Sequence, residues 1–252
     1  MSSPSATIRS DLPFSIAGAE RGGRWVIACD HATNRVPPDV TPLGLSSEDM
    51  ARHIAYDPGA LGTSLALGEA LGAPVVSSNF SRLVIDPNRG PDDPTLIMQL
   101  YDGSIIPGNR MLTREGRAWR LESYHAAYHG ALARTLAARP DAILVSIHSF
   151  TPRLRGRPFR PWEVGVLFAG DRRLSDPLIA ALAAHTAAPV GINEPYGGDL
   201  PGDTVDRHAL GAGRLNALIE LRNDVIATPG GQRDWAGKLA QALQSALSEI
   251  DG

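Results

Sequence analysis

The sequence predicts a single α/β domain whose central sheet is mixed but mostly parallel and carries helices on both faces. Segments typical of strands alternate with segments typical of helices along the 252 residues. The candidate strands are continuously apolar, which is typical of strands buried on both faces. Because there is no internal repeat and no convincing linker, we expect one domain over residues 21–252, preceded by a flexible, Ser- and Pro-containing arm over residues 1–20.

The first half of the chain begins this alternation. Residues 24–31 (RWVIACDH) form an apolar run with a polar end, which predicts a buried strand. Residues 46–57 begin with the Ser and Glu of a helix cap and predict a short helix, and the Ala- and Leu-rich residues 59–72 predict a second helix that glycine ends. We expect two short strands within residues 73–86 and a loop over the Pro- and Gly-rich residues 87–95.

The second half continues the pattern and closes on a helix. Residues 115–138 give the longest helical pattern, and the β-branched residues 142–150 predict a central strand. Residues 193–209 are rich in Gly and Asp and predict a long irregular loop, a type of segment that often serves as a functional lid. The remaining predicted elements are a strand, a helix, a strand and an amphipathic helix over residues 160–170, 176–187, 216–227 and 231–250.

Composition and charge exclude several classes of protein. The formal net charge is −3 and there is no long basic run, so we do not expect nucleic acid as the main partner. No segment approaches about 18 consecutive apolar residues and the N-terminus lacks a signal pattern, which predicts a cytoplasmic protein without a membrane span. The single cysteine, Cys29, excludes an intrachain disulfide and agrees with a reducing compartment. These features leave the oligomeric state open.

Polar side chains follow four of the predicted strands at the point where each strand ends. Because ligands of α/β sheets bind beyond the carboxyl ends of the strands, we expect these side chains to converge on one site. The sequence has no G-x-S-x-G elbow and no glycine-rich phosphate loop, which leaves metal-assisted hydrolysis as the chemistry that histidines and carboxylates support. The polar strand ends are Asp30-His31, Asp86 with Asn88-Arg89, His148-Ser149, and Glu220 with Arg222-Asn223.

An ordered set of short motifs gives the sequence a resemblance to a known family. "VIDPNRGPDD", "VSIHSFTP" and "IELRND" are similar in order and spacing to segments of zinc carboxypeptidases. With "DPGA", "PGN", "YH" and "NEPY" added, the chain resembles the N-formylglutamate amidohydrolase family more closely, over residues 24–245. The resemblance implies a zinc carboxypeptidase-like (phosphorylase/hydrolase-like) fold. It also implies hydrolysis of N-formyl-L-glutamate, or of a similar N-acyl amino acid, to formate and the free amino acid, a reaction of histidine degradation.

The resemblance implies that His31 and His148 bind Zn²⁺ or another divalent metal. The carboxypeptidases have a metal-binding glutamate three residues after the first histidine, where this sequence has Asn34. Asn is a poor, uncharged zinc ligand, so we expect Asp57 to complete a site of two histidines and one acid. Two alternatives stay open: Asp57 precedes Pro58 and could cap the following helix, and either histidine could be a strand-end residue bonded to backbone.

Matching positions also imply a general base and a carboxylate-binding pair. Glu220 resembles the base that takes a proton from water, and Asn88 and Arg89 resemble the residues that bind a substrate carboxylate. Glu220 could instead form a buried ion pair with Arg222 or Arg89. Arg89, in turn, could be a structural bridge to a nearby aspartate.

Three further residues are candidates for the substrate site. We expect Arg82 there, although its position four residues before Asp86 also suits an ion pair between the two. Tyr196 could donate a hydrogen bond to an oxyanion or to substrate, and so has a possible catalytic role. Arg207 could bind a second carboxylate. The alternative for the last two is that they belong to a solvated loop.

The remaining histidines and the alternative functions complete the sequence-based expectations. His125 and His129 share one helix face and are interpreted as pocket-wall or core residues, and His53 as an ordinary helix residue. One alternative function is a carboxypeptidase- or amidase-type enzyme acting on another N-acyl amino acid or a peptide. Another is a non-catalytic relative that binds a carboxylate ligand, a reading that Asn34 in place of the usual glutamate favours.

Overall fold

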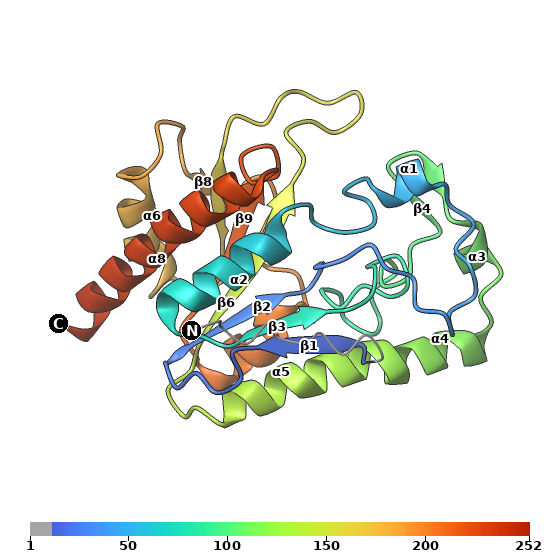
Figure 1. Cartoon of the computed structure of the whole chain (residues 1–252), viewed down its shortest axis with the longest axis horizontal. Coiled ribbons are helices and arrows are strands. Elements are labelled where there is room, and N and C mark those ends of the chain that lie inside the picture. Colours follow the sequence, from blue (N-terminus) through green and yellow to red (C-terminus); the bar gives the residue numbers. More distant parts are fainter. Residues whose placement is uncertain (1–11) are drawn as a thin grey trace, which may run out of the picture.

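The computed structural model describes residues 12–252. Within these residues, seven strands form one sheet with helices on both faces (Figure 1). Most neighbouring strands run parallel, and antiparallel pairs occur between the first and second and between the fifth and sixth strands in spatial order. This confirms the α/β class and the mixed, mostly parallel sheet. In spatial order the strands are β1 (Phe14–Ala17), β3 (Val75–Ser78), β2 (Trp25–Cys29), β6 (Ile143–Phe150), β9 (Asn216–Arg222), β7 (Val164–Leu167) and β8 (Gly191–Ile192).

Both faces of the sheet are apolar because successive strand residues point to opposite sides. Ile27 and Cys29 of β2 pack into the apolar cluster on one face, whereas Val26 and Ala28 pack into the cluster on the other. Figure 1 shows long helices on each side of the strands. The first face is covered by α2 (Ala60–Leu71), α6 (Ser175–Ala183) and α8 (Pro229–Asp251), and the second by the continuous helix of α4 (Arg114–Arg120), the π-helical turn η1 (Leu121–Ala126) and α5 (Ala127–Ala137).

Part of the predicted N-terminal arm belongs to the sheet. β1 pairs antiparallel with β3, with Phe14 opposite Ser78 and Ala17 opposite Val75. The expectation of a flexible arm therefore does not hold for residues 14–17, and residues 1–11 of that prediction lie outside the described residues. A run of four residues is too short for its periodicity to predict a strand.

The segment over residues 73–86 contains one strand instead of the predicted two. After β3, residues 80–86 form buried turns in which the Val84 N–H donates to the Ser81 carbonyl. The Asp86 N–H donates to the Leu96 carbonyl, outside the sheet. An apolar run of this length indicates burial but does not distinguish a strand from buried turns.

The first predicted helix is shorter than expected. In α1 (Ser47–Met50), Ser46 accepts a hydrogen bond from the Asp49 N–H, which confirms the predicted cap. The helix ends at Met50, so His53 and Asp57 lie in the turns that follow it. Besides β1, the elements that the sequence did not predict are short: β4 (Leu100–Tyr101), β5 (Ser104–Ile105), α3 (Pro107–Arg110), β8, α7 (Thr204–His208) and η2 (Leu210–Ala212).

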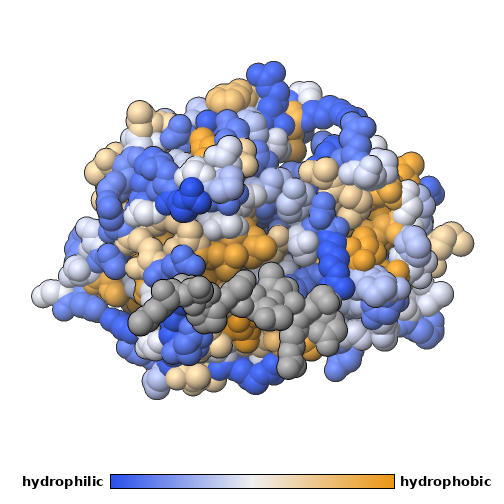
Figure 2. Space-filling view, in the orientation of Figure 1, coloured by the Kyte–Doolittle hydropathy of each residue, from blue (hydrophilic) through white to orange (hydrophobic). Residues whose placement is uncertain are grey.

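The outer surface mixes polar and apolar residues. On the face seen in Figure 2, apolar residues form several separate patches between polar ones. Within residues 12–252, none of the helices is both long and apolar enough to cross a membrane.

Candidate active site

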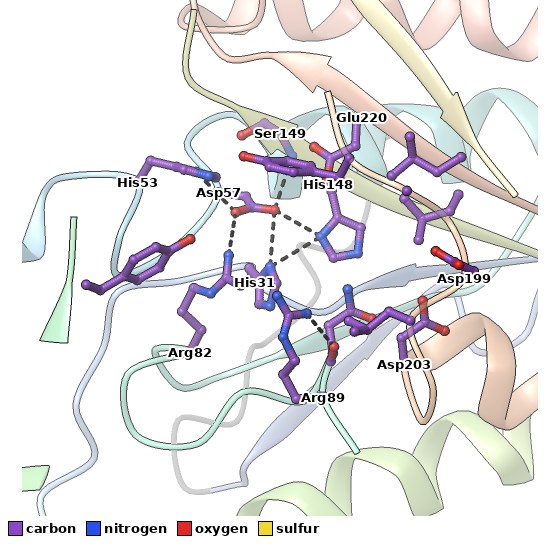
Figure 3. A pocket seen from close by; sticks show the side chains of 17 residues that line it. His31, His53, Asp57, Arg82, Arg89, His148, Ser149, Asp199, Asp203 and Glu220 are labelled. Carbon is purple, nitrogen blue, oxygen red and sulfur yellow. Dashed lines mark hydrogen bonds and ion pairs between the residues drawn. The ribbon is translucent and has the colours of Figure 1, made fainter. Parts of the chain in front are cut away.

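Three side chains from distant parts of the chain meet at the carboxyl ends of β2 and β6 (Figure 3). His31 lies two residues beyond the end of β2, and His148 lies near the carboxyl end of β6. Asp57 lies three residues before α2. The Asp57 N–H donates to the His31 carbonyl at 2.9 Å, and the Ser149 N–H donates to Asp57 Oδ2 at 3.1 Å. Backbone groups of both strand ends therefore fix the position of Asp57. The α2 helix begins at Gly59 as its cap, so Asp57 does not cap it with its side chain.

The three side chains place their nitrogen and oxygen atoms in a compact triangle that could hold a metal ion. Asp57 Oδ2 lies 3.3 Å from His31 Nδ1 and 3.0 Å from His148 Nδ1, and the two nitrogens are 3.2 Å apart. Two ligands of a tetrahedral zinc ion, at bond lengths of about 2.0–2.1 Å, lie about 3.3 Å from each other. The size of the triangle and its two-histidine, one-carboxylate composition both suit zinc. Within residues 12–252 this is the one group of His, Cys, Asp and Glu that could hold a metal ion.

A second carboxylate orients each imidazole. His31 Nε2–H donates to Asp86 Oδ1 at 2.7 Å, and His148 Nε2–H donates to Asp30 Oδ2 at 3.1 Å. Both rings therefore turn the same nitrogen, Nδ1, toward Asp57. Carboxylates that bind the outer nitrogen fix the tautomer and orientation of metal-binding histidines.

Asp86 is itself held by charged and backbone donors. Arg82 donates Nε and Nη2 to Asp86 Oδ2 at 3.0 and 2.7 Å, and the Asn88 N–H donates to Oδ1 at 2.9 Å. Burial acts to raise the pKa of Asp86, but the charges of Arg82 and His31 hold it well below its usual value. The predicted Arg82–Asp86 pair is present, although the two residues do not lie on a strand.

Asp30 is surrounded by hydroxyl donors. Tyr128 and Thr204 donate to Oδ1 at 2.6 and 2.8 Å, and Ser146 donates to Oδ2 at 3.2 Å. Burial acts to raise the pKa of Asp30, but hydrogen bonding and charge from His148 lower it below its usual value. Asp30 is therefore a fixed, ionised partner for His148.

Glu220 lies beside the two histidines with one free oxygen. The register of β6 and β9 places Glu220 opposite His148, so both side chains leave the sheet at the same level. Its Oε2 is buried without a hydrogen-bond partner in the described residues. Burial raises the pKa of Glu220 to about 7. The alternative pairing with Arg222 is not seen, because Arg222 donates to Asp224 and to backbone carbonyls.

A cavity of about 360 Å³ collects nearly all the predicted site residues. Arg89 lines it and donates to the neutral acceptors Thr95 Oγ1 and the Asn88 carbonyl at 3.1 and 2.7 Å. Asn88 accepts from the Thr204 N–H through Oδ1, which leaves its amide NH₂ as the donating end. The predicted residues that line the cavity are His31, Asp57, Arg82, Asn88, Arg89, His148, Tyr196 and Glu220.

Tyr196 lies at the exposed side of the cavity. Its hydroxyl oxygen accepts from Arg160 Nη1 at 3.3 Å, and the Arg160 guanidinium lies over the ring at 5.1 Å. Burial raises the pKa of Tyr196 to about 12, so the hydroxyl keeps its proton at neutral pH and can donate it in a hydrogen bond.

Two predicted residues lie elsewhere. Asn34 donates to the Met50 carbonyl at 2.8 Å, and Asp57, not Asn34, lies with the two histidines in the group that could hold a metal ion. Arg207 is exposed on α7 and, among residues 12–252, is not one of those lining the cavity. The sequence predicted an irregular loop over residues 193–209, and the five-residue helix α7 within it is too short for a pattern that would predict the direction of the Arg207 side chain.

The sequence did not predict several residues that line the cavity. His53 lies in a turn with Nδ1 3.3 Å from Asp57 Oδ1, instead of on a helix. Its position four residues before Asp57 was the available signal. Tyr101, Asp199 and Asp203 are the other lining residues with titratable side chains that the sequence did not predict. Tyr101 ends the two-residue strand β4, and Asp199 and Asp203 lie in the segment that leads to α7, where spacing carries little information on side-chain direction.

A cluster of three histidines supports the loop that carries Asn88 and Arg89. His125 Nε2–H donates to the Arg89 carbonyl and His129 Nε2–H to the Pro87 carbonyl, both at 2.9 Å. His129 Nδ1 accepts from His208 Nε2–H at 2.9 Å. His125 and His129 therefore lie behind the cavity wall, where the helix pattern placed them.

Comparison with known proteins identifies the family. The family model described as N-formylglutamate amidohydrolase matches residues 23–227. The chain belongs to the N-formylglutamate amidohydrolase family. The family that the sequence motifs predicted is therefore confirmed.

Several known proteins resemble the chain over nearly its whole length. The N-formylglutamate deformylase of Pseudomonas aeruginosa is 29% identical over 246 residues, which span 89% of this chain and 90% of that protein. The crystal structure of gene product Atu2144 from Agrobacterium tumefaciens superposes with a TM-score of 0.91 at 36% identity, covering 96% and 98% of the two chains. N-formylglutamate amidohydrolase from Ralstonia eutropha shares the fold, with a TM-score of 0.69 at 18% identity over 95% and 100% of the chains.

Proposed function

We propose that this member of the N-formylglutamate amidohydrolase family is a metal-dependent hydrolase that releases formate from an N-formyl amino acid. The observation that carries the proposal is the ligand triangle of His31, His148 and Asp57 beside the free oxygen of Glu220. N-formyl-L-glutamate is the substrate that the names of the relatives suggest, and it is the reference compound for any assay.

The ligand triangle would hold the metal ion. His31 and His148 would bind through Nδ1 and Asp57 through Oδ2, with zinc as the metal that this donor set favours. When bound, a divalent cation supplies Lewis acidity, which polarises the amide carbonyl and makes water a stronger acid. The carboxylates of Asp86 and Asp30 keep both imidazoles in the orientation that binding requires.

Glu220 is the proposed general base. Its partnerless Oε2 accepts a proton from the attacking water, and the resulting carboxylic acid gives the proton to the nitrogen that leaves. Water thus adds to the formyl carbon as the C–N bond breaks, and the products are formate and the free amino acid. The raised pKa of Glu220 suits a group that both accepts and returns a proton near neutral pH.

Arg89, Asn88 and Tyr196 are the proposed substrate-binding donors. Arg89 offers the remaining N–H groups of its guanidinium to a carboxylate, and the Asn88 amide points its NH₂ into the same cavity. The Tyr196 hydroxyl is a donor for the carbonyl oxygen or the carboxylate. Fixed at one end in this way, the substrate presents its amide to Glu220 in a defined orientation.

The decisive experiment is a formate-release assay on purified protein depleted of metal and then reloaded with zinc. We expect hydrolysis of at least one compound in a set of N-formyl amino acids that includes the glutamate, norleucine and lysine derivatives. Activity should disappear with the metal and return with it. Absence of formate from every compound, with a stoichiometric amount of zinc bound, would refute the proposal.

A larger acyl group is the second candidate, and a neighbouring cavity favours it. A cavity of about 530 Å³ meets the first one at His53 and Tyr101, which line both. An acyl chain longer than formyl could extend past these two side chains. The same assay with N-acetyl and longer N-acyl amino acids, followed by release of the amine, distinguishes the two candidates.

The alternative of a non-catalytic relative rested on the absence of a third, acidic metal ligand at position 34. Asn34 stands where the carboxypeptidases have a ligand glutamate, but Asp57 brings a carboxylate to the two histidines from another segment. Zinc content of the purified protein tests this point independently of turnover.

A further inference from the structure

His53 lies between the ligand triangle and the space that a substrate can occupy. Its side chain lines the cavity of about 360 Å³ and also the neighbouring cavity of about 530 Å³. Figure 3 shows the ring directed toward Asp57, the carboxylate of the triangle. The proposed hydrolysis gives this histidine no role, although it contacts a ligand residue and faces the cavity.

The Nδ1 atom of His53 faces the second oxygen of the ligand carboxylate. His53 Nδ1 lies 3.3 Å from Asp57 Oδ1, and Arg82 Nη1 lies 3.6 Å from the same oxygen. His53 Nδ1 and Asp57 Oδ1 are both buried, and neither makes a well-directed hydrogen bond within residues 12–252. A lone pair on Nδ1 would be repelled by the carboxylate, so the ring proton belongs on Nδ1, where a small rotation completes the bond to Asp57.

The other nitrogen of the ring is open to the cavity. Within residues 12–252, His53 Nε2 has no hydrogen-bond partner and, unlike Nδ1, it is not shielded from solvent. With the proton on Nδ1, Nε2 carries a lone pair and is a hydrogen-bond acceptor. A doubly protonated, positive ring would be repelled by Arg82 and by a metal ion on Asp57, which favours the neutral form.

An N-formyl amino acid has one polar group that the proposed site leaves without a partner. Its carboxylate is assigned to Arg89 and Asn88, and its carbonyl oxygen to the metal ion. The amide N–H is a hydrogen-bond donor that loses its water as the substrate enters the cavity. Because a buried donor without an acceptor is costly, the site needs an acceptor close to the metal.

The other candidate acceptors are occupied or lie farther away. Glu220 is assigned to the attacking water. The Asn88 oxygen accepts from a backbone N–H at 3.1 Å, and the Ser149 hydroxyl is bonded to a backbone carbonyl at 3.0 Å. Asp199 and Asp203 lie on the opposite side of the ligand triangle from the imidazole in Figure 3.

We propose that His53 positions the substrate by accepting the N–H of the scissile amide on Nε2, while its Nδ1–H holds Asp57. This inference rests on the proposed hydrolysis of N-formyl amides, and it does not depend on which amino acid side chain the substrate carries. With its N–H on His53 and its carboxylate on Arg89, the amide is held on both sides of its nitrogen. The formyl carbon is then presented to the water at Glu220 in one orientation.

The test compares an amide with an ester that lacks the N–H. The amide is the N-formyl amino acid that the protein hydrolyses fastest, and the ester is the formate ester of the matching 2-hydroxy acid. Both compounds keep the carboxylate and the formyl carbonyl. Rates are measured at saturating zinc and corrected for spontaneous ester hydrolysis. Each variant is compared with the unsubstituted protein on the same compound, so the different reactivity of amide and ester cancels.

His53→Asn removes the acceptor and keeps a donor for Asp57. The asparagine NH₂ can take the place of Nδ1, whereas no atom of asparagine replaces Nε2. We expect kcat/KM to fall about tenfold for the amide and less than about twofold for the ester, as for the loss of one hydrogen bond. The dissociation constant for zinc should stay unchanged, because the bond to Asp57 is kept.

His53→Gln is the converse variant. The glutamine oxygen can reach the place of Nε2 and accept the N–H, but the donor to Asp57 is lost. At saturating zinc this variant should lower kcat/KM for the amide no more than for the ester, while zinc binds more weakly. His185→Asn is the matched control, since His185 follows α6 and, among the described residues, lines neither cavity. It should change neither rate nor zinc affinity.

Different results contradict this inference and the proposed function. Equal losses on amide and ester in His53→Asn, or no loss on either, would rule out the N–H contact while leaving the hydrolase intact. A loss in His53→Asn that added zinc restores would show that His53 acts only through Asp57. A larger loss on the amide than on the ester in His53→Gln would also count against the contact. Absence of formate release from every N-formyl compound, with zinc bound to the unsubstituted protein, would instead overturn the proposed function.

Discussion

The Nδ1 atoms of His31 and His148 lie 3.2 Å apart, although 117 residues separate the two histidines along the chain. Each ring donates its other nitrogen to a buried carboxylate, so both Nδ1 lone pairs face the same point. Two lone pairs so close repel each other unless an electron acceptor lies near both. The Asp57 carboxylate at 3.0 and 3.3 Å adds negative charge at that point, which makes a cation the natural acceptor.

His148→Ala should remove the metal while the fold survives. The substitution takes away one of three ligand atoms but leaves the apolar packing of β6 on both faces. We expect zinc content to fall well below stoichiometric and formate release to be lost, with the far-ultraviolet circular dichroism unchanged. His185→Ala, at a histidine in the turn that follows α6, is the control and should keep its zinc. Stoichiometric zinc in His148→Ala would contradict the ligand assignment.

Glu220→Gln should keep the metal and lose turnover. Glutamine has the same shape but cannot accept and return a proton, so kcat should fall on the order of 10²-fold or more. Because Glu220 is not in the ligand triangle, zinc content should stay stoichiometric. A rate close to that of the unsubstituted protein would remove Glu220 from the role of base.

The parts of the fold that the sequence predicted correctly are those with a long, uniform pattern. β6 is eight residues of buried strand, and α8 carries an amphipathic repeat, so periodicity alone placed both. Residues 80–86 are also continuously buried, but their hydrogen bonds run to loops, and only tertiary contacts decide that. β1 forms its strand hydrogen bonds only with β3, and its four residues are too few for a periodic pattern that predicts a strand.

The site residues also differ in how well the sequence predicted them. His148 and Glu220 lie on strands and His31 follows β2 by two residues, so the sheet itself places them and their convergence could be predicted. Asp57 was predicted from its chemistry, and the structure brings it to the histidines by backbone hydrogen bonds. The direction of Arg207, and the presence of Asp203 in the cavity, depend on how α7 packs, which no local pattern encodes.

Arg89→Lys should weaken the binding of substrates with a free carboxylate. Lysine keeps the charge but cannot keep the bonds from Nε and Nη1 that fix the guanidinium against Thr95 and the loop backbone. We expect KM to rise on the order of tenfold, as for the loss of one charged hydrogen bond, with a smaller effect on kcat. A substrate analogue with an amidated carboxylate should show no such rise. An equal rise for that analogue would rule out a carboxylate contact.

Thr204→Val should weaken metal binding without changing substrate binding. The Thr204 hydroxyl donates to Asp30, which orients His148, while its backbone N–H donates to Asn88. Valine removes the first bond and keeps the second, so the dissociation constant for zinc should rise about 10- to 100-fold with KM unchanged.

Thr204→Ser keeps the hydroxyl and should restore zinc binding. Thr135→Val, which removes a buried hydroxyl that donates to a carbonyl of its own helix, controls for the general loss of a hydrogen bond. A normal zinc affinity in Thr204→Val, measured by competition with a chelator, would show that Asp30 does not need this donor.

His129 should make the fold less stable in mild acid. Burial lowers the pKa of His129 to about 3, and the nearby charges of His125, Arg207 and His208 add to the effect, opposed by Asp30. An unfolded histidine has a pKa of about 6.5, so below that pH the unfolded chain binds a proton that the folded chain does not. The free energy of unfolding therefore falls as the pH drops from about 6.5 toward 3.

His129→Gln should remove this part of the pH dependence, because glutamine can still donate to the Pro87 carbonyl but does not titrate. Between pH 7 and pH 5 one such histidine contributes about 2 kcal/mol, at about 1.4 kcal/mol per pH unit below the unfolded pKa. In denaturant unfolding with chelator present for both proteins, the drop from pH 7 to pH 5 should be smaller in the variant by about that amount. An identical drop in the two proteins would mean that His129 is protonated in the folded chain, and the histidine cluster behind Arg89 would then be a charged support instead of a neutral one.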